Sequence, residues 1–149
     1  MKTINSFKGE YEFLSNFYSH NVTYAGLTFK NNEAAFQSAK VFDDEIKIKF
    51  TTLNPSEAKR LGRRVKLRSD WENAKDDVML NVLRAKFSDN TLAKFLLDTG
   101  DAELVEGTTG WHDNYWGTCE CDKCAGIPGK NMLGKLLTQV RSELRAKWL

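Results

Sequence analysis

The stretch Ser69-Asp70-Trp71-Glu72 and the residues that follow it, up to Phe87, decide the fold class. Ser69 and Glu72 have the spacing of a capping box, which begins an α-helix. After this box, apolar residues recur at three- and four-residue spacing, the pattern of a helix that buries one face. These apolar residues are Trp71, Val78, Met79, Val82, Leu83 and Phe87. We therefore predict a long helix near the centre of the chain.

Further helices are predicted on both sides of this one. Each has an Asn before its first turn that can cap the helix. The helix of residues 55–62 also has Pro55 at its first position and Gly62 at its end. The other predicted helices span about residues 33–42 and 90–100, and a last helix follows Asn131. Its buried stripe consists of Leu133, Leu136, Leu137, Val140 and Leu144.

Strands are predicted only in short segments. Residues 22–24 and 27–29 are alternating runs separated by Ala25-Gly26, which is typical of a hairpin with a two-residue turn. Residues 102–105 are a further candidate strand, and residues 107–130 form a long loop. A long irregular loop in a compact domain is usually functional. We predict an α+β fold, predominantly helical, as a single compact domain of residues 1–149 with one small sheet and a long functional loop.

Composition and charge exclude several classes of protein. The chain has 149 residues, 41% of them hydrophobic, which suits one domain with a real core. Its formal net charge of +2 provides no global basic field for nucleic acid or anionic lipid, so any such binding must be local. No apolar run approaches the ~20 residues of a membrane span, and the first residues lack a secretory signal. We expect an intracellular, cytoplasmic protein that does not bind membranes.

The loop segment Trp111-His112-Asp113-Asn114-Tyr115-Trp116-Gly117 contains two indoles, a phenol, an imidazole and a carboxylate. Flat aromatic rings can stack on a nucleobase or a sugar. The carboxylate of Asp113 can stabilise positive charge that develops as a bond breaks. We predict that this segment is a wall of the active site.

A second candidate lies on the predicted helix of residues 33–42. Glu33, Phe36, Gln37 and Lys40 recur at the spacing of one helix face. They can form an ordinary solvated surface. If the face instead lines a pocket, Glu33 can stabilise a cationic transition state and a desolvated Lys40 can act as a nucleophile.

Three segments are candidate anion sites, each with an alternative. Ser15-Asn16 can bind a ligand or close a turn on its own backbone. The run of residues 63–68 can bind phosphate through Arg64, Lys66 and Arg68, or it can be solvated surface. Gly129-Lys130-Asn131 precedes a helix, whose first N–H groups attract anions.

The three cysteines of the chain, Cys119, Cys121 and Cys124, form one tight cluster. An odd number argues against a disulfide framework. Their C-x-C-x-x-C spacing can surround zinc, with His112 or another residue as the fourth ligand. Reduced loop cysteines are the alternative.

Taken together, several blocks of the chain resemble one family. They are residues 10–18, EYEFLSNFY; 33–40, EAAFQSAK; 58–63, AKRLGR; 111–117, WHDNYWG; and 129–134, GKNMLG. All occur in order between about Phe7 and Leu144. This arrangement is similar to the NADAR family, also called YbiA-like, and is more specific than any one motif.

The resemblance implies an N-glycosidase that cleaves a ribose C1–N bond and needs no cofactor for catalysis. It implies Glu33, Lys40 and Asp113 as catalytic residues, with Lys40 capturing the opened sugar as a Schiff base. The substrate-binding residues that it implies are Ser15, Asn16, Phe17, Phe36, Gln37, Gly62, Arg63, Trp71, Trp111, Tyr115, Trp116, Gly129, Asn131, Leu133 and Gly134. The cysteine cluster leaves a structural zinc ion open.

Two substrate classes follow from the resemblance. One is ADP-ribose attached to guanine in DNA, removed in defence against DNA-modifying toxins, and the other is the phosphoribosylated intermediates of riboflavin synthesis. We expect the first, because the basic run and the helix start can hold a pyrophosphate. The alternatives are a module that binds ADP-ribose or a nucleotide without cleaving it, and a small zinc-stabilised interaction domain.

Overall fold

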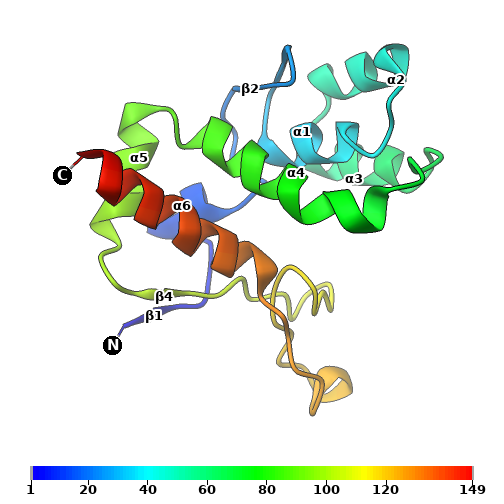
Figure 1. Ribbon diagram of the computed structural model, residues 1–149. Coiled ribbons are helices and arrows are strands. Elements are labelled where there is room, and N and C mark those ends of the chain that lie inside the picture. The colour runs from blue at the N-terminus through cyan, green and yellow to red at the C-terminus, as the bar shows by residue number, and fades with distance from the viewer. Residues whose placement is uncertain (1, 149) are drawn as a thin grey trace. The chain divides into compact units, whose positions relative to one another are not determined.

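The computed structural model describes residues 2–148 (Figure 1). The described residues fall into two compact units by their contacts. Unit 1 consists of the residues up to Ser15 together with those from Asn90 onward, and unit 2 is Asn16–Asp89. That the two units form the single domain of residues 1–149 stays a prediction.

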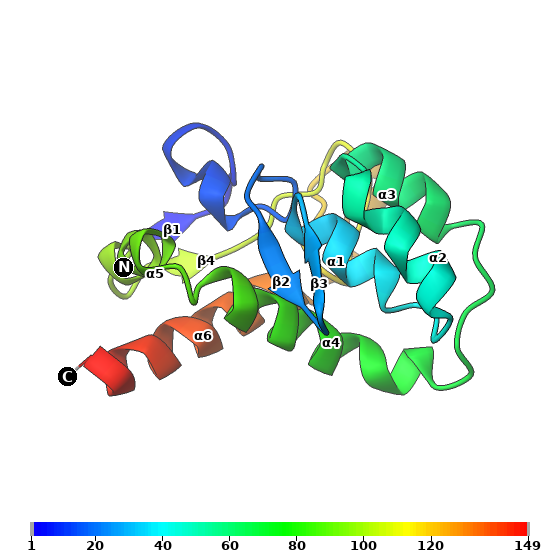
Figure 2. The ribbon, with the colours of Figure 1, turned by 90° about the horizontal axis from the view of Figure 1, so that it is seen from above.

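Unit 2 is mainly helical. Its helices are α1 (Asn32–Ser38), α2 (Asp44–Lys49), the 3-10 helix η2 (Phe50–Thr52), α3 (Pro55–Gly62) and α4 (Trp71–Lys86). Strands β2 (Val22–Tyr24) and β3 (Leu27–Phe29) form an antiparallel hairpin. The hairpin lies beside α1 and α4 (Figure 2), and α1 also packs on α3.

The hairpin confirms the prediction from Ala25-Gly26. Ala25 has φ 52° and Gly26 has φ 85°, so both central residues are left-handed, as a two-residue turn between twisted strands requires. Val22 therefore pairs with Phe29, and both side chains are buried. This register directs one face of the hairpin into the core of unit 2.

Local capping begins two of the helices as predicted. The Asn31 side chain accepts a hydrogen bond from Ala34 N at 2.7 Å and begins α1. Asn54 and Glu57 form a complete capping box at the start of α3. In contrast, the capping box predicted at Ser69 is wrong, because the N-cap residue of α4 is Asp70 and its side chain makes no cap bond. The Asp70 carboxylate is instead paired with Arg68 at 2.6 Å.

The helix predicted for residues 33–42 ends earlier, at Ser38. Ala39 is its C-cap, and Lys40 N donates to Gln37 O at 3.1 Å, the bond of a tight turn rather than of a continuing helix. The chain then leaves the helix because Lys40 O accepts a hydrogen bond from Arg68 N at 2.8 Å. Lys40 therefore lies in the turn that follows α1.

Unit 1 contains the N-terminal and C-terminal parts of the chain. Its elements are β1 (Thr3–Ile4), the 3-10 helix η1 (Gly9–Leu14), α5 (Asn90–Asp98), β4 (Glu103–Leu104), the 3-10 helix η3 (Asp122–Cys124) and α6 (Met132–Trp148). Strands β1 and β4 pair in parallel, and α6 packs against α5 and β4. Residues 107–130 are irregular apart from η3, as predicted for the long loop.

The strands of the described residues form two two-stranded sheets, whereas one small sheet was predicted. The predicted strand of residues 102–105 is confirmed as β4, but its partner β1 carries no alternating pattern because it has only two residues. The α+β, predominantly helical fold class is confirmed. Among the described residues, no helix is long and apolar enough to cross a membrane.

Candidate functional site

Lys40 is held in a defined position within unit 2. It is half-buried, and its Nζ atom lies 3.5 Å from the carbonyl oxygen of Gly62 at the end of α3. Arg68 bonds the backbone on this turn, through its N–H to Lys40 O at 2.8 Å and through its guanidinium to Ala39 O at 3.4 Å. The amine is therefore placed by two elements, α3 and the segment before α4.

The surroundings of Lys40 favour its uncharged form. Burial lowers the pKa of Lys40 below its usual value, and the positive charges of Arg63 and Lys59 lower it further. The negative charge of Glu33 opposes this shift but is outweighed. An amine with a lowered pKa has a larger uncharged fraction near neutral pH, and only this form is a nucleophile.

Helix α1 supplies the other side chains of this group. Glu33, Phe36 and Gln37 are all buried, so their helix face is not the solvated surface of the alternative interpretation. The Gln37 Oε1 atom is buried without a hydrogen-bond partner. A Cβ atom at Gly62 would overlap with the Gln37 carboxamide, so a side chain at this position would force Gln37 to move.

The segment that precedes the hairpin supports α1. Glu33 N donates to Asn16 O at 3.1 Å, and the buried Asn16 carboxamide contacts Asn32 and Met79. Phe17 is 45% exposed, with the Lys59 ammonium 5.5 Å from its ring centre. Asn16 thus has a structural role, while Phe17 offers an accessible ring. Ser15 closes η1 in unit 1, where its N–H donates to Glu12 O at 3.0 Å.

Two of the predicted binding residues lie in the core of unit 2. The rings of Phe36 and Trp71 are 5.2 Å apart at an angle of 54°, and both are buried. A tilted pair of this kind stabilises the packing of α1 on α4. Trp71 therefore contributes to the packing of α4 on α1.

The basic run of residues 63–68 is not a uniform phosphate-binding strand. Arg68 forms a bidentate pair with Asp70, at 2.6 Å and 2.8 Å, and its guanidinium lies 4.2 Å from the centre of the Phe42 ring. These contacts occupy its donors. Arg63 is exposed and close enough to Lys40 to lower the pKa of that amine. Arg63 is thus the member of the run whose charge acts on the Lys40 amine.

The aromatic segment belongs to unit 1 and is held by side-chain-to-backbone hydrogen bonds. One oxygen of Asp113, Oδ1, accepts from Tyr115 N at 2.8 Å and from Trp116 N at 2.9 Å. The rings of Tyr115 and Trp116 meet edge to face with centres 4.9 Å apart. Trp111 is 48% exposed. The Asp113 carboxylate shapes the turn. Trp111 is the accessible aromatic ring of this segment.

The start of α6 is occupied by this same loop. Met132 N and Leu133 N each donate at 3.0 Å, to Tyr115 O and Trp116 O respectively. The Asn131 carboxamide bonds Glu106 N and Leu104 O, so Asn131 joins α6 to β4 and does not cap the helix with its side chain. These helix N–H groups are therefore used inside the protein, and the predicted anion site at this position lacks them.

Two glycines beside this helix start lie where a side chain would not fit. A Cβ atom at Gly134 would overlap with Leu104 O, and one at Gly129 would lie 2.7 Å from Thr118 Cα. Both residues were predicted to bind substrate. Packing against these backbone atoms is sufficient to explain glycine at both positions.

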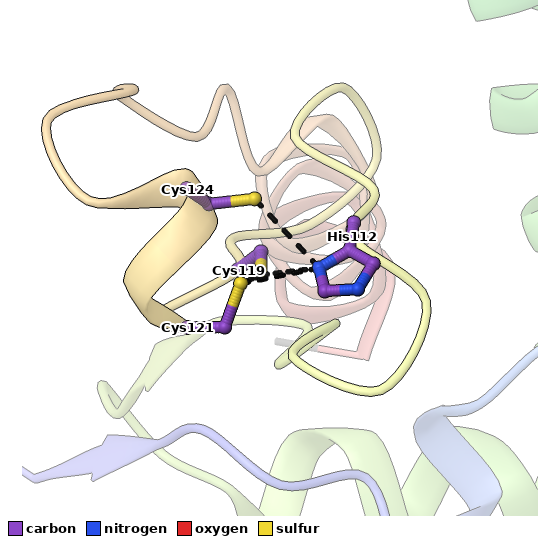
Figure 3. A group of neighbouring side chains, drawn as sticks. All are labelled: His112, Cys119, Cys121 and Cys124. Atoms are coloured by element: carbon purple, nitrogen blue, oxygen red, sulfur yellow. Dashed lines mark hydrogen bonds between the residues drawn. The ribbon is translucent and has the colours of Figure 1, made fainter.

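The three cysteines and His112 converge, as Figure 3 shows. His112 Nδ1 lies 3.4 Å from the Sγ atom of Cys119, 3.2 Å from that of Cys121 and 3.8 Å from that of Cys124. All three thiols are free. The hydrogen bond from the Cys119 thiol lowers the pKa of Cys121 to about 6, so the group includes a thiolate at neutral pH.

One buried ionisable residue was missed by the sequence reasoning. Lys86, in α4, is 1% exposed, and burial lowers its pKa to about 7. Its ammonium lies 5.4 Å from the centre of the Tyr18 ring and 5.3 Å from that of the Phe87 ring. The helical periodicity placed the apolar stripe correctly but gave no signal that a lysine beside it is buried.

The comparisons with known proteins agree with the sequence resemblance. The family model described as NADAR domain matches residues 5–145. The N-glycosidase YbiA of Escherichia coli (strain K12) is 38% identical over 139 residues, which cover 91% of this chain and 82% of that protein. The NMR structure of E. coli YbiA superposes with a TM-score of 0.82 at 35% identity, covering 99% of this chain and 88% of that one.

A further relative carries a different name. The riboflavin biosynthesis protein VVA0006 of Vibrio vulnificus is 37% identical over 139 residues, 89% of this chain but only 35% of that protein. The prediction of a hydrolase of N-glycosyl bonds is confirmed at the level of the family, through the name of the E. coli relative. The family match over nearly the whole chain leads to one conclusion: this chain belongs to the NADAR family.

Proposed function

We propose that this protein is an N-glycosidase that hydrolyses the bond between C1 of a phosphorylated ribose and a nitrogen atom of a base. The observation that carries the proposal is the half-buried Lys40, whose pKa is lowered by burial beside the buried carboxylate of Glu33. A solvated surface pair would have neither the burial nor the lowered pKa.

In the proposed reaction, the C1–N bond breaks and its electron pair leaves with the base, which takes up a proton. Glu33 stabilises the positive charge that develops on the sugar. The uncharged amine of Lys40 forms a bond to C1 and loses a proton. The bond between C1 and the ring oxygen then breaks, its electron pair goes to that oxygen, which takes up the proton, and C1 forms a Schiff base with the amine. Water then adds to C1, and the amine leaves as the free sugar forms.

The role of Asp113 is narrower in this proposal. Its Oδ1 atom already accepts two backbone hydrogen bonds, from Tyr115 and Trp116. Hydrogen bonds of this kind hold the carboxylate oxygen in its own turn. We therefore assign the stabilisation of the sugar to Glu33 first and keep Asp113 as a second candidate.

The favoured substrate is ADP-ribose attached to guanine in DNA. Phe17 in unit 2 and Trp111 in unit 1 are exposed rings, 45% and 48%, and each by itself can stack on a base of this substrate, adenine or guanine. Lys59 and Arg63, the cations that act on Lys40, suit the phosphates next to the ribose. Within the basic run this support rests on Arg63 and not on Arg68, which is paired with Asp70. It does not use the helix start, where Met132 N and Leu133 N donate to Tyr115 O and Trp116 O.

Phosphoribosylated intermediates of riboflavin synthesis are the second candidate, favoured by the name of the Vibrio relative. They share the phosphorylated ribose and the C1–N bond, so Lys40, Glu33 and Arg63 would act on them in the same way. They carry one small ring, which needs a single stacking surface.

The deciding experiment incubates the purified protein with ADP-ribosylated guanine DNA and with the riboflavin intermediates and identifies the released base by mass spectrometry. We expect release of unmodified guanine in DNA, and no release by the Lys40→Ala variant. Faster turnover of the riboflavin intermediates would reverse the substrate preference. Binding of ADP-ribosylated DNA without release from any substrate would leave a binding module and reject the N-glycosidase.

A further inference from the structure

The segment between Trp111 and Cys124 brings together four side chains that all offer metal ligands. The Nδ1 atom of His112 and the three Sγ atoms of Cys119, Cys121 and Cys124 lie within 4.8 Å of one another. No other group of three or more such residues within this distance occurs in residues 2–148. Three thiols and an imidazole are one of the ligand sets of structural zinc sites.

The distances match the edges of a tetrahedron around zinc. With Zn–S of about 2.3 Å and Zn–N of about 2.0 Å, tetrahedral geometry places sulfurs about 3.8 Å apart and nitrogen about 3.5 Å from each sulfur. The observed distances from Nδ1 to the three sulfurs are 3.4, 3.2 and 3.8 Å, and the Cys119 and Cys121 sulfurs are 3.3 Å apart. Three of these four distances are slightly shorter than the tetrahedral spacing, and the distance from Nδ1 to the Cys124 sulfur is slightly longer.

The backbone is shaped to present these ligands. His112 has φ 58°, a left-handed conformation that is uncommon for a residue with a side chain, and its N–H donates to Thr108 O at 2.7 Å. The short helix η3 turns the chain so that Cys124 N bonds Cys121 O at 3.1 Å. Cys119 N is bonded by the Asn114 side chain at 3.0 Å. Each ligand is therefore fixed by its own local contact, as a preformed site requires.

We propose that His112, Cys119, Cys121 and Cys124 bind one structural zinc ion, which braces the loop that carries the aromatic segment. Four protein ligands close the coordination sphere, so the ion has no open position for substrate. The ligands His112 and Cys119 enclose the residues from Asp113 to Thr118, so the ion ties both ends of the segment that contains Tyr115 and Trp116.

The consequence for activity rests on the function proposed above. The loop also holds the start of α6, through the bonds from Met132 N to Tyr115 O and from Leu133 N to Trp116 O. Loss of zinc should therefore loosen both the aromatic segment and the first turn of α6. Lys40 and Glu33 lie in unit 2 and are not among the residues that the ion ties together.

The test measures the metal directly. Protein purified in the presence of a reductant should contain about one zinc per chain by elemental analysis. The Co(II)-substituted protein should show thiolate-to-cobalt absorption and the intense visible bands of tetrahedral cobalt. His112→Ala should lose most of the zinc, whereas His20→Ala, which changes the only other histidine, should keep it. Removal of zinc by a chelator should lower the Tm by at least about 5 °C, and added zinc should restore it.

A chain that stays free of zinc after expression with added zinc, and that gives no thiolate-to-cobalt absorption, would overturn the proposal. So would bound iron with the visible spectrum of an iron–sulfur cluster. If His112→Ala does not fold, chelation and reloading of the unmodified chain give the same answer. A zinc-loaded protein that is inactive on every substrate would reject the proposed function and leave the zinc site standing.

Discussion

The two regions that carry the candidate site residues are built by different means. In unit 2, α1 and α3 bury Glu33 and Gln37 in regular structure, and burial sets the chemistry of Lys40. In unit 1, the loop of residues 107–130 has little regular structure and is held by side chains such as Asp113 that bond the backbone. Burial lowers the pKa of Lys40, whereas the backbone hydrogen bonds of Asp113 fix the shape of the loop. Changes in unit 2 should therefore act on the reaction itself, and changes in the loop mainly on stability.

The largest effect is expected for Lys40→Ala. If Lys40 is the nucleophile, turnover should fall by more than about 1,000-fold. Folding should be unaffected, since the lysine is only half-buried. Borohydride added during turnover should trap an adduct on Lys40 of the unmodified chain. Lys49→Ala, at an exposed lysine of α2, is the matched control and should keep full activity. Normal rates in Lys40→Ala would reject the Schiff-base route.

A smaller loss is expected for Glu33→Gln, which keeps the shape of the side chain and removes its charge. If the carboxylate stabilises the transition state as strongly as a typical oxyanion-hole donor, the rate constant kcat should fall by about 100-fold. Glu33 raises the pKa of Lys40, so removal of the Glu33 charge should lower that pKa. The increase of the rate with pH should then occur at lower pH values. An unchanged rate with the same pH profile would assign Glu33 a structural role.

Lys86 tests how strongly burial lowers the pKa of a lysine in unit 2 that is not part of the candidate site. Its pKa is about 7 in the folded chain and 10.5 for an unperturbed lysine, so the unfolded state binds more protons between these values. The free energy of unfolding should therefore rise with pH from about 7 to 10.5, by at most about 1.4 kcal/mol per pH unit. Lys86→Met should remove this rise. Denaturant unfolding at several pH values measures the rise, and equal slopes in the two chains would contradict the prediction.

A pair of glycine changes compares the packing of the two regions. Gly62→Ala should lower the free energy of unfolding by about 1–3 kcal/mol, because the new methyl group would overlap with the buried Gln37 side chain. Gly110→Ala in the loop should change it by less than about 0.5 kcal/mol, since no heavy atom lies within 4 Å of the new position. Equal losses in thermal or denaturant unfolding would mean that the loop is packed as tightly as the α1–α3 contact.

The smallest effect is expected for Asp113→Asn. The Asn carbonyl oxygen can still accept the hydrogen bonds of Tyr115 N and Trp116 N, so both stability and rate should stay close to normal. Asp113→Ala removes both bonds and should lower the free energy of unfolding by about 1–2 kcal/mol. A folded Asp113→Asn variant with a rate lowered more than about tenfold would show that the charge of Asp113 acts on the substrate.

Features of short range were determined by the sequence itself. The Ala25-Gly26 turn, the Asn31 cap and the Asn54–Glu57 capping box all form as their residues predict, because each depends on groups within a few positions of one another. The C-x-C-x-x-C spacing likewise predicted a group of converging thiols, and the blocks from Phe7 to Leu144 identified the family.

Other features were decided only by tertiary structure, because they join residues far apart in the chain. The N-cap of α4 is Asp70 rather than the predicted Ser69, and its carboxylate pairs with Arg68. Arg68 N also donates to Lys40 O just beyond the end of α1 at Ser38. Strand β1 pairs with β4 across about a hundred residues, and Asn131 bonds that strand rather than its own helix. The burial that lowers the pKa of Lys40 also comes from distant elements. Local propensity depends on neighbouring residues, whereas burial and long-range pairing depend on which surfaces the whole chain brings together.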